Sequence, residues 1–404
     1  MLTLTIFILT YLGVAVGRIP ALTLDRTGIA LLGAIAMVVF DAISVPEAVA
    51  AVDFPTILLL YALMMISAQL RLGGFYTWIV LRITILLGRP RLFLAAMMLT
   101  SAVLSAVLAN DIICLAFTPV LCVALVRAAL NPIPFLIGLA VSSNIGSAAT
   151  IIGNPQNMLI GQLGNLHFGA FSAWCLPPST MALFASYLMI SWICRKNFIH
   201  SGYQVPMESV QGWPPLNPWQ STKGVIAVII LIILFFTPIP REISAIGVAG
   251  ILLCSRKMKS RNIMQLVDWH LITLFCALFI VIQGITIEKI PAVILGYLHE
   301  RGIDLGNLYI LTGVSAVLSN MVSNVPATML LTQFLDPSYP IQWYALAVSS
   351  TFAGNLIIIG SIANLIVIEQ ARPYGIVIGF KEHARVGIPV TLISLVILMV
   401  WMLG

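Results

Sequence analysis

Apolar runs follow one another through nearly the whole chain and are separated by short polar or charged stretches. A membrane-spanning helix needs about 20 mostly apolar residues, so these runs predict transmembrane helices. We expect spans near 2–17, 27–40, 54–70, 133–162, 170–193, 224–240, 242–255, 269–285, 342–370 and 386–403, with interfacial helices at 74–88 and 287–301. The first run lacks a basic start and a small-residue cleavage site, so we interpret it as a span rather than a signal peptide. The sequence predicts an all-α polytopic membrane protein.

Two of these runs are interrupted in the middle by Ser, Asn and Gly in nearly the same order. Residues 139–160 read LAVSSNIGSAATIIGNPQNMLI, and residues 346–367, 207 positions later, read LAVSSTFAGNLIIIGSIANLIV. A helix that unwinds inside a membrane exposes backbone groups where there is no water, and it persists only where it lines a cavity or is buried in protein. We therefore interpret 133–162 and 342–370 as the broken helices of a secondary transporter.

Two further stretches, 92–127 and 306–335, have polar residues at their centres. We interpret each as a re-entrant helical hairpin that returns to the side it left; a crossing pair of short helices would return to the same side. With the N-terminus outside, 17 of the 20 Lys and Arg residues fall inside, and only Arg241, Lys289 and Arg301 fall outside. This distribution satisfies the positive-inside rule.

The two halves of the chain carry matching landmarks in the same order. Asp53 and Asp268 each open a span, 215 positions apart, and a hairpin and a broken helix follow in each half. Each half has five crossings and one hairpin, and an odd number of crossings inverts the second half. We predict two inverted repeats, 1–197 and 223–404, joined by a cytoplasmic linker at 198–222.

Composition agrees with a membrane location, because 60% of the residues are hydrophobic and only 8% are charged, against about 25% in soluble proteins. The net charge of +6 follows from the basic residues of the inner side and needs no nucleic-acid partner. The six Cys have no metal-binding spacing, so we expect no metal and no cofactor beyond H⁺ or Na⁺ as a coupling ion. The five His lie in loops or near span ends and no HExxH is present, which disfavours an intramembrane enzyme.

The polar residues of the hairpins and breaks are the candidate functional residues. Asp111 turns the first hairpin, and a charge at mid-membrane costs on the order of 3 kcal/mol, so we expect it to bind a cation or carry a proton; capping of the following half-helix is the structural alternative. We expect the substrate to contact Asn110, Ser143, Asn144, Asn157, Ser319, Asn320, Ser323, Asn324, Asn355 and Asn364. We expect ion coupling to involve Asp111, Asn110, Thr150, Gly153, Asn154, Gly360 and Ser361.

These motifs resemble the ion transporter superfamily, which includes arsenite permeases, related sodium/proton antiporters and divalent anion/sodium symporters. Residues 145–157, IGSAATIIGNPQN, are similar to the broken helix around the symporters' sodium site, and Ser323-Asn324 resembles the start of their Ser-Asn-Thr hairpin motif. The first hairpin, ANDIICLAFTPVL from Ala109, is instead similar to the Ala-Asn-Asp segment of arsenite permeases. Ser361-Ile362-Ala363 departs from the Thr-Pro-Pro run expected at a second cation site. The resemblance implies an elevator mechanism, an inner-membrane location and a homodimer.

The function implied by the resemblance is secondary active transport. A fixed carboxylate in the substrate chamber repels di- and tricarboxylates and suits a neutral or weakly charged solute. We therefore expect export of arsenite or antimonite, or movement of a small inorganic or organic anion, driven by protons carried on Asp111. A sodium-coupled carboxylate or sulfate symporter and a sodium/proton antiporter are the alternatives, and a passive channel would need no inverted broken helices.

Overall fold

The computed structural model describes residues 2–17, 24–195, 198, 215–255 and 257–403, and every regular element in this part of the chain is a helix. The first half contains α1 (Leu2–Val16), α2 (Arg26–Val39), α3 (Val45–Ala51), α4 (Phe54–Leu72), α5 (Phe75–Ile83), α6 (Pro90–Leu108), α7 (Asn110–Arg127), α8 (Pro132–Ser147), α9 (Pro155–Leu163) and α10 (Phe168–Ile193). The second half contains α11 (Pro218–Leu234), α12 (Arg241–Leu253), α13 (Ser260–Met264), α14 (Trp269–Ile287), α15 (Ile290–Glu300), α16 (Leu308–Val322), α17 (Asn324–Leu331), α18 (Pro340–Ala353), α19 (Ile362–Ala371) and α20 (Phe380–Trp401). Short 3-10 turns are η1 (Thr84–Leu86), η3 (Thr332–Phe334), η4 (Ile358–Gly360) and η5 (Arg372–Tyr374).

Apolar helices dominate the outside of the protein as well as its core. Among the described residues, α4, α6, α7, α10, α14 and α20 are each long and apolar enough to cross a membrane. Large apolar side chains such as Phe184 and Trp192 on α10 and Val400 on α20 are more than half exposed. An aqueous surface would not favour such exposure over whole helices, whereas lipid does. The prediction of an all-helical membrane protein with many apolar helices is confirmed.

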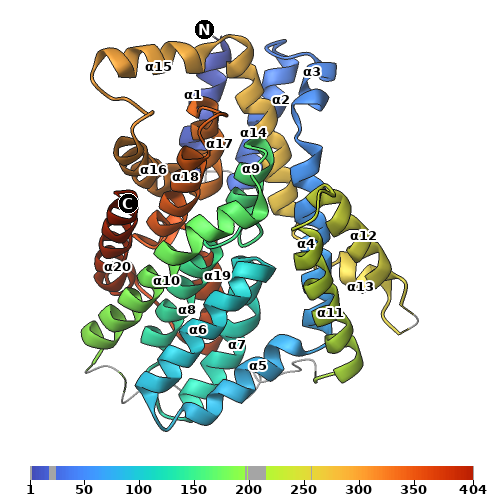
Figure 1. The fold of residues 1–404 in the computed structure, drawn as a ribbon, viewed down its shortest axis with the longest axis vertical. Helices are drawn as coiled ribbons and strands as arrows, with labels where there is room; N and C mark the ends of the chain where they lie inside the picture. Colours follow the sequence, from blue (N-terminus) through green and yellow to red (C-terminus); the bar gives the residue numbers. More distant parts are fainter. Residues whose placement is uncertain (1, 18–23, 196–197, 199–214, 256, 404) are drawn as a thin grey trace.

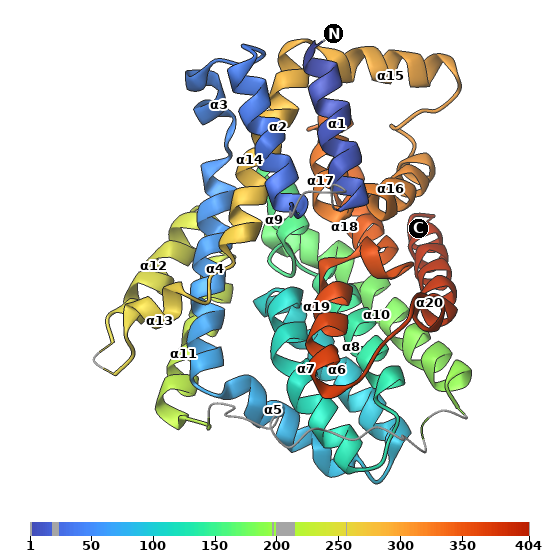
Figure 2. The ribbon, with the colours of Figure 1, turned by 180° about the vertical axis from the view of Figure 1, so that it is seen from behind.

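Two groups of helices lie toward opposite ends of the molecule (Figures 1 and 2). α1, α2, α3 and α14 form one end, where α15 lies across the top of the view, and α6, α7 and α8 form the other end, near α5. The packing pairs correspond between the two halves: α2 packs along α14 as α12 packs along α4, and α6 packs along α8 as α16 packs along α18. α10 and α20 pack against each other at the side of the molecule. The breaks and the hairpin tips meet between these groups.

The hairpin helices differ in length between the halves. α6 and α7 contain 19 and 18 residues, and each could cross a membrane by length and composition. α16 contains 15 residues and α17 only 8, so α17 is too short to span. The broken helices are interrupted where the sequence predicts, because α8 stops at Ser147 before α9 starts at Pro155, and α18 stops at Ala353 before α19 starts at Ile362.

Two helices start six residues earlier than the sequence predicts, because their first two turns accommodate polar and charged residues. α11 begins at Pro218 rather than 224, and its Lys223 extends to the carbonyl oxygen of Leu252 at 3.1 Å. α20 begins at Phe380 rather than 386, and the Glu382 carboxylate accepts the Gly379 N–H at 2.7 Å. Charged residues therefore belong to both helices. Most of the predicted linker, residues 199–214, lies outside the described residues.

Candidate functional site

Each hairpin turns at one residue with a positive φ. Ala109, with φ 61°, joins α6 to α7, and Ser323, with φ 74°, joins α16 to α17. This backbone region is rare for residues with a Cβ and costs on the order of 1–3 kcal/mol. Such strain persists only where the surrounding structure holds it in place. The two tips share this geometry although their sequences differ.

The first tip is bonded to the first broken helix. The Asn110 backbone N–H donates to the Gly153 carbonyl at 3.0 Å, and the Asn110 amide Nδ2 donates to Asn144 Oδ1 at 3.0 Å. Ser143 Oγ donates to the Asn110 carbonyl at 3.1 Å. Asn110 Oδ1 is buried and has no partner among the described residues. The tip is fixed to α8 and to the break, while one polar atom remains available to a ligand.

The second tip is bonded to the second broken helix in a comparable way. With the Asn324 amide in the orientation that satisfies its neighbours, its nitrogen donates to the Ser350 carbonyl at 3.1 Å and the Gly360 carbonyl at 2.9 Å. Asn320 Nδ2, one turn before the tip, donates to the Ala353 carbonyl at 2.9 Å. Each hairpin and its neighbouring break therefore form one hydrogen-bonded unit.

The unwound carbonyls of both breaks accept hydrogen bonds from an asparagine that lies on the following half-helix. Asn157 Nδ2 donates to the carbonyls of Ser147 at 3.2 Å and Thr150 at 2.9 Å. Asn364 Nδ2 donates to Gly354 at 2.8 Å and Ile357 at 3.2 Å. Because buried carbonyls need partners, these two amides stabilise the breaks from within the protein.

Asn144 connects the two broken helices at the centre of the molecule. Its Oδ1 accepts from Asn110 Nδ2 and from Ser361 Oγ, the latter at 3.0 Å. Its Nδ2 donates to Asn355 Oδ1 at 2.9 Å and Asn364 Oδ1 at 3.3 Å. An amide oxygen accepts two hydrogen bonds and an amide nitrogen donates two, so the protein itself uses the full capacity of this side chain.

The two tips and the two half-helix starts enclose a small cavity, which we call the tip cavity. It is narrow in this structure and is lined by Asn110, Asp111, Pro155, Gln156, Ser323, Asn324, Val325, Ser361 and Ile362. Four helices, α7, α9, α17 and α19, begin at these residues. A helix N-terminus carries roughly half a positive charge and free N–H groups, and Asp111 is the one charged residue among those lining the cavity. The tip cavity therefore favours polar or anionic oxygen atoms, and the carboxylate opposes a full negative charge.

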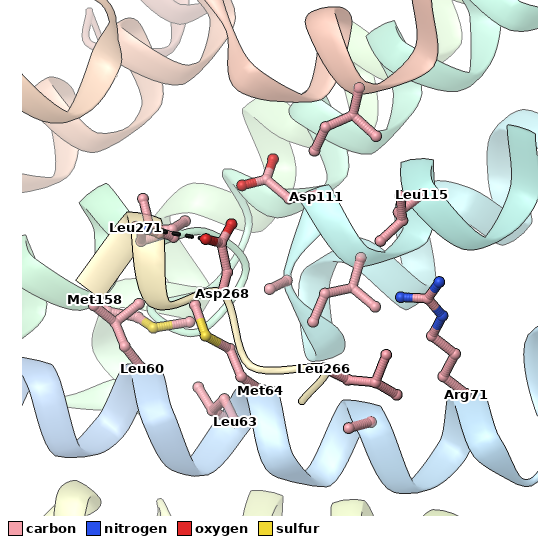
Figure 3. Close-up of a pocket in the computed structure, with 15 residues that line it drawn as sticks. Leu60, Leu63, Met64, Arg71, Asp111, Leu115, Met158, Leu266, Asp268 and Leu271 are labelled. Carbon is pink, nitrogen blue, oxygen red and sulfur yellow. Dashed lines mark hydrogen bonds between the residues drawn. The ribbon is translucent and has the colours of Figure 1, made fainter. Parts of the chain in front are cut away.

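A second, larger cavity, which we call the access cavity, reaches Asp111 from the side of α4 (Figure 3). Its volume is about 80 Å³, and most of its lining is apolar. Its charged residues are Asp111, Asp268 and Arg71. Asp268 precedes α14, and Arg71 lies in the last turn of α4. The access cavity connects α4 to the first hairpin tip.

The predicted site residues occupy three places. Five of them, Asn110, Asp111, Ser323, Asn324 and Ser361, line the tip cavity. A buried network behind it contains Ser143, Asn144, Asn154, Asn157, Asn355 and Asn364. Ser319 and Asn320 lie on α16, Thr150 donates to the Ala106 carbonyl, and Gly153 and Gly360 lie in the breaks. At Gly153 a Cβ would lie 2.1 Å from the Ser147 carbonyl oxygen, so a larger residue would displace the break.

Four residues of this region were not predicted from the sequence. Gln156 lines the tip cavity, and Asp268 and Arg71 line the access cavity. His383, expected in a loop or near a span end, lies in the first turn of α20, where it is buried and its ring Nε2 lies 3.2 Å from the Asn355 carbonyl oxygen. A signal for Gln156 existed, since it lies within the quoted GNPQN run. The other three are brought to the site by the fold alone.

The chain resembles known membrane transporters over most of its length. The Escherichia coli inner membrane protein YbiR is 31% identical over 332 residues, which are 80% of this chain and 81% of that protein. The silicon efflux transporter LSI3 of Oryza sativa subsp. japonica is 26% identical over 446 residues, covering 93% of this chain and 92% of the rice protein.

The fold is also similar to that of a solved transporter. The crystal structure of the Alcanivorax borkumensis YdaH transporter covers 99% of this chain and 96% of its own, with a TM-score of 0.57 at 14% identity. Residues 6–352 match the family described as citrate transporter. The resemblance to the ion transporter superfamily is thus confirmed, and the chain is a membrane transporter that belongs to the citrate transporter family.

Proposed function

We propose that this protein is a secondary active transporter that moves a small, oxygen-rich solute in exchange for protons. The solute is arsenite or antimonite in its neutral hydroxide form, or a small oxyanion. It binds in the tip cavity, and Asp111 carries the coupling proton. The observation that carries this proposal is the position of one carboxylate where four helices begin.

Electrostatics links the proton to the solute. When Asp111 is ionised, its carboxylate accepts hydrogen bonds from the hydroxyl groups of a neutral solute. When Asp111 is protonated, the carboxyl group loses its charge and part of its capacity to accept these bonds. Protonation and solute binding therefore oppose each other, so protons that enter down their gradient can be exchanged for a solute that leaves. Among the described residues the Asp111 carboxylate has no hydrogen-bond or ion-pair partner, so it is free to exchange a proton.

The composition of the tip cavity supports a neutral or weakly charged solute. The amide nitrogens of Asn110, Gln156 and Asn324 already donate to protein groups, so their amide oxygens are left to accept hydrogen bonds from the hydroxyl groups of a solute. The Ser323 hydroxyl, which also lines the tip cavity, can donate or accept. The rice relative is a silicon efflux transporter by name. Arsenite at neutral pH is an uncharged hydroxide. Asn144, in contrast, is saturated by protein partners, and we propose that it holds the two breaks together instead of contacting the solute.

Sodium-coupled symport of a carboxylate is the second candidate, favoured by the family description and by the unwound carbonyls of the two breaks. Those carbonyls are already bonded to Asn157 and Asn364. A sodium ion would have to displace both amides, and a multiply charged carboxylate would approach two aspartates and one arginine. Proton coupling to a weakly charged solute requires neither.

We infer that the two halves are inverted repeats that act as an elevator. The corresponding packing pairs, the two strained tips and the two bonded breaks support this inference. Arg71, at the end of the access cavity, belongs to the basic residues that the charge distribution assigns to the inner side. We therefore infer an inward-facing state, an external N-terminus and an inner-membrane location, and the homodimer implied by the resemblance stays a prediction.

The test is arsenite accumulation in cells that lack their own arsenite efflux pump and express the wild type or Asp111→Asn. We expect the wild type to lower accumulation and Asp111→Asn to lose the effect, because Asn cannot release a proton. Asn also caps helices well, so the variant retains the start of α7; expression level and melting temperature serve as folding controls.

Two outcomes would contradict the proposal. If Asp111→Asn exports arsenite as well as the wild type, the carboxylate does not couple transport. If the wild type does not change arsenite accumulation but takes up citrate only when sodium is present, the second candidate replaces the first.

A further inference from the structure

Asp268 faces Asp111 across the access cavity (Figure 3). Both side chains line the same cavity, their carboxylate groups point toward each other, and their negative charges repel. Arg71, the third charged residue of the lining, lies on the other side of the view, beside Leu115. In Figure 3 the guanidinium group of Arg71 lies apart from the two carboxylate groups.

The two carboxylates belong to different parts of the fold. Asp268 is the N-cap of α14, and its Oδ1 accepts the Leu271 N–H at 3.0 Å. Asp111 lies in the first turn of α7, immediately after the strained tip residue Ala109. α14 packs on α2, whereas α7 packs on α8 and α19. A movement of the hairpin relative to α14 would separate the two groups.

The other charged side chains of the neighbouring helices lie outside the lining of this cavity. They are Arg26 on α2, Glu47 on α3, Arg82 on α5, Arg91 on α6, Arg127 on α7, His270 on α14, His299 and Glu300 on α15, Glu369 on α19 and Arg372 on η5. A negative charge beside a carboxylate in a mostly apolar cavity disfavours ionisation of that carboxylate. The charge of Asp268 therefore favours a proton on Asp111 while the hairpin is in this position.

We propose that Asp268 is a positioning residue for proton coupling: it holds a proton on Asp111 in this conformation and lets it go when the hairpin tip moves away. This inference rests on the proposed role of Asp111 as the proton carrier. It adds what that role requires, namely a difference in proton affinity between two conformations, because a ligand drives a conformational change only through differential affinity.

The chain provides a matched control in Asp53. Asp53 is the N-cap of α4 and accepts the Thr56 N–H at 2.8 Å, as Asp268 does for α14. It lines a different cavity, together with Gln283 and Gln333. Because Asn is as good an N-cap as Asp, Asp268→Asn and Asp53→Asn both retain the helix start, and only the first removes the charge that faces Asp111.

The first experiment needs no substrate. The melting temperature of the purified protein is measured between about pH 5 and pH 9 for the wild type, Asp268→Asn, Asp53→Asn, Asp111→Asn and the Asp111→Asn/Asp268→Asn double variant. Repulsion between two carboxylates grows as pH rises, so the wild type loses stability with rising pH. We expect Asp268→Asn to flatten this pH dependence and Asp53→Asn to leave it unchanged. The double variant should differ little from Asp111→Asn or Asp268→Asn alone, because either single substitution already removes the repulsion between the two carboxylates.

The second experiment records the pH dependence of arsenite export in inverted vesicles. We expect Asp268→Asn to move the profile toward acid by about one pH unit, because Asp111 loses its negative neighbour, and Asp53→Asn to follow the wild type.

The inference is overturned if the Asp268→Asn melting curve runs parallel to that of the wild type. If the wild type moves no arsenite, the proposed function fails, and the melting temperatures still decide the inference.

Discussion

Ala109 holds the first hairpin tip in a conformation that glycine adopts more readily, with φ 61° and ψ 127°. Replacing it by Gly removes about 1–3 kcal/mol of strain, which exceeds the roughly 0.4–1 kcal/mol that the freer unfolded chain costs. We expect Ala109→Gly to raise the melting temperature of the purified protein. Ala109→Val should lower it, because a β-branched residue fits a positive φ worse than Ala does.

The control for this prediction is Ala106→Gly, in the last turn of the same helix, where the backbone is helical. At this position the substitution relieves no backbone strain, and it should lower the free energy of unfolding by up to about 1 kcal/mol. Equal losses of stability in Ala106→Gly and Ala109→Gly would show that the tip is not strained.

Individual site residues could be predicted where a polar side chain interrupts an apolar run. Asn110, Asp111 and Asn324 stand out in the sequence for this reason, because a polar group at mid-membrane is costly, and the structure places all three at the tip cavity. Asp268 and Arg71 lie at the ends of apolar runs, where charged residues are common. Only the tertiary fold brings these two residues to the lining of the access cavity.

At the scale of elements, Arg241 attaches α12 to the end of the half-helix α9. Its guanidinium donates to the Gly161 carbonyl at 2.6 Å, the Leu166 carbonyl at 2.9 Å and Gln162 Oε1 at 3.2 Å. Gly161 lies in the last turn of α9, where a cation is favourable. Hydrogen bonds to charged groups contribute about 1.5–3 kcal/mol, so we expect Arg241→Gln to lower the melting temperature by several degrees.

Arg26 is the matched control, because it starts α2 as Arg241 starts α12, 215 positions later. Its Nη1 is buried without a partner among the described residues. We expect Arg26→Gln to change stability much less than Arg241→Gln does. If both variants lose the same stability, loss of packing and not the bonds to α9 explains the effect.

The elements themselves were largely predictable, and their ends were less so. Apolar length identifies most spans, and the Gly-rich and Asn-rich runs identify both breaks, at 148–154 and 354–361. The starts of α11 and α20 were placed too late, because charges were taken to end a span. Lys223 instead donates a hydrogen bond to the neighbouring helix α12, and Glu382 caps the start of α20. Hydropathy encodes neither the tertiary contact of Lys223 nor the local contact of Glu382.

At the scale of the whole molecule, the two halves differ in how far their cavities penetrate. The access cavity reaches the first tip at Asp111. The cavity that contains Asp53 is lined in part by positions that correspond to those of the access cavity in the other half, such as Gln283 for Ala68. Its lining includes Leu163 and Gln333 but neither tip residue, Ala109 or Ser323. If the halves are inverted repeats, these cavities open to opposite sides of the membrane, and only the inner one reaches the solute site.

Cysteine labelling tests this arrangement. Leu115 lines the access cavity and Gln283 lines the cavity of Asp53. In a background without the accessible thiols of Cys254 and Cys276, we expect a membrane-impermeant maleimide to modify Leu115→Cys in inside-out vesicles and Gln283→Cys in right-side-out vesicles. The parent protein with no introduced cysteine is the control for slow labelling of the buried thiols. Labelling of both positions from one side would refute the inverted repeats. Labelling from the opposite sides to those expected would place the N-terminus inside, against the distribution of Lys and Arg.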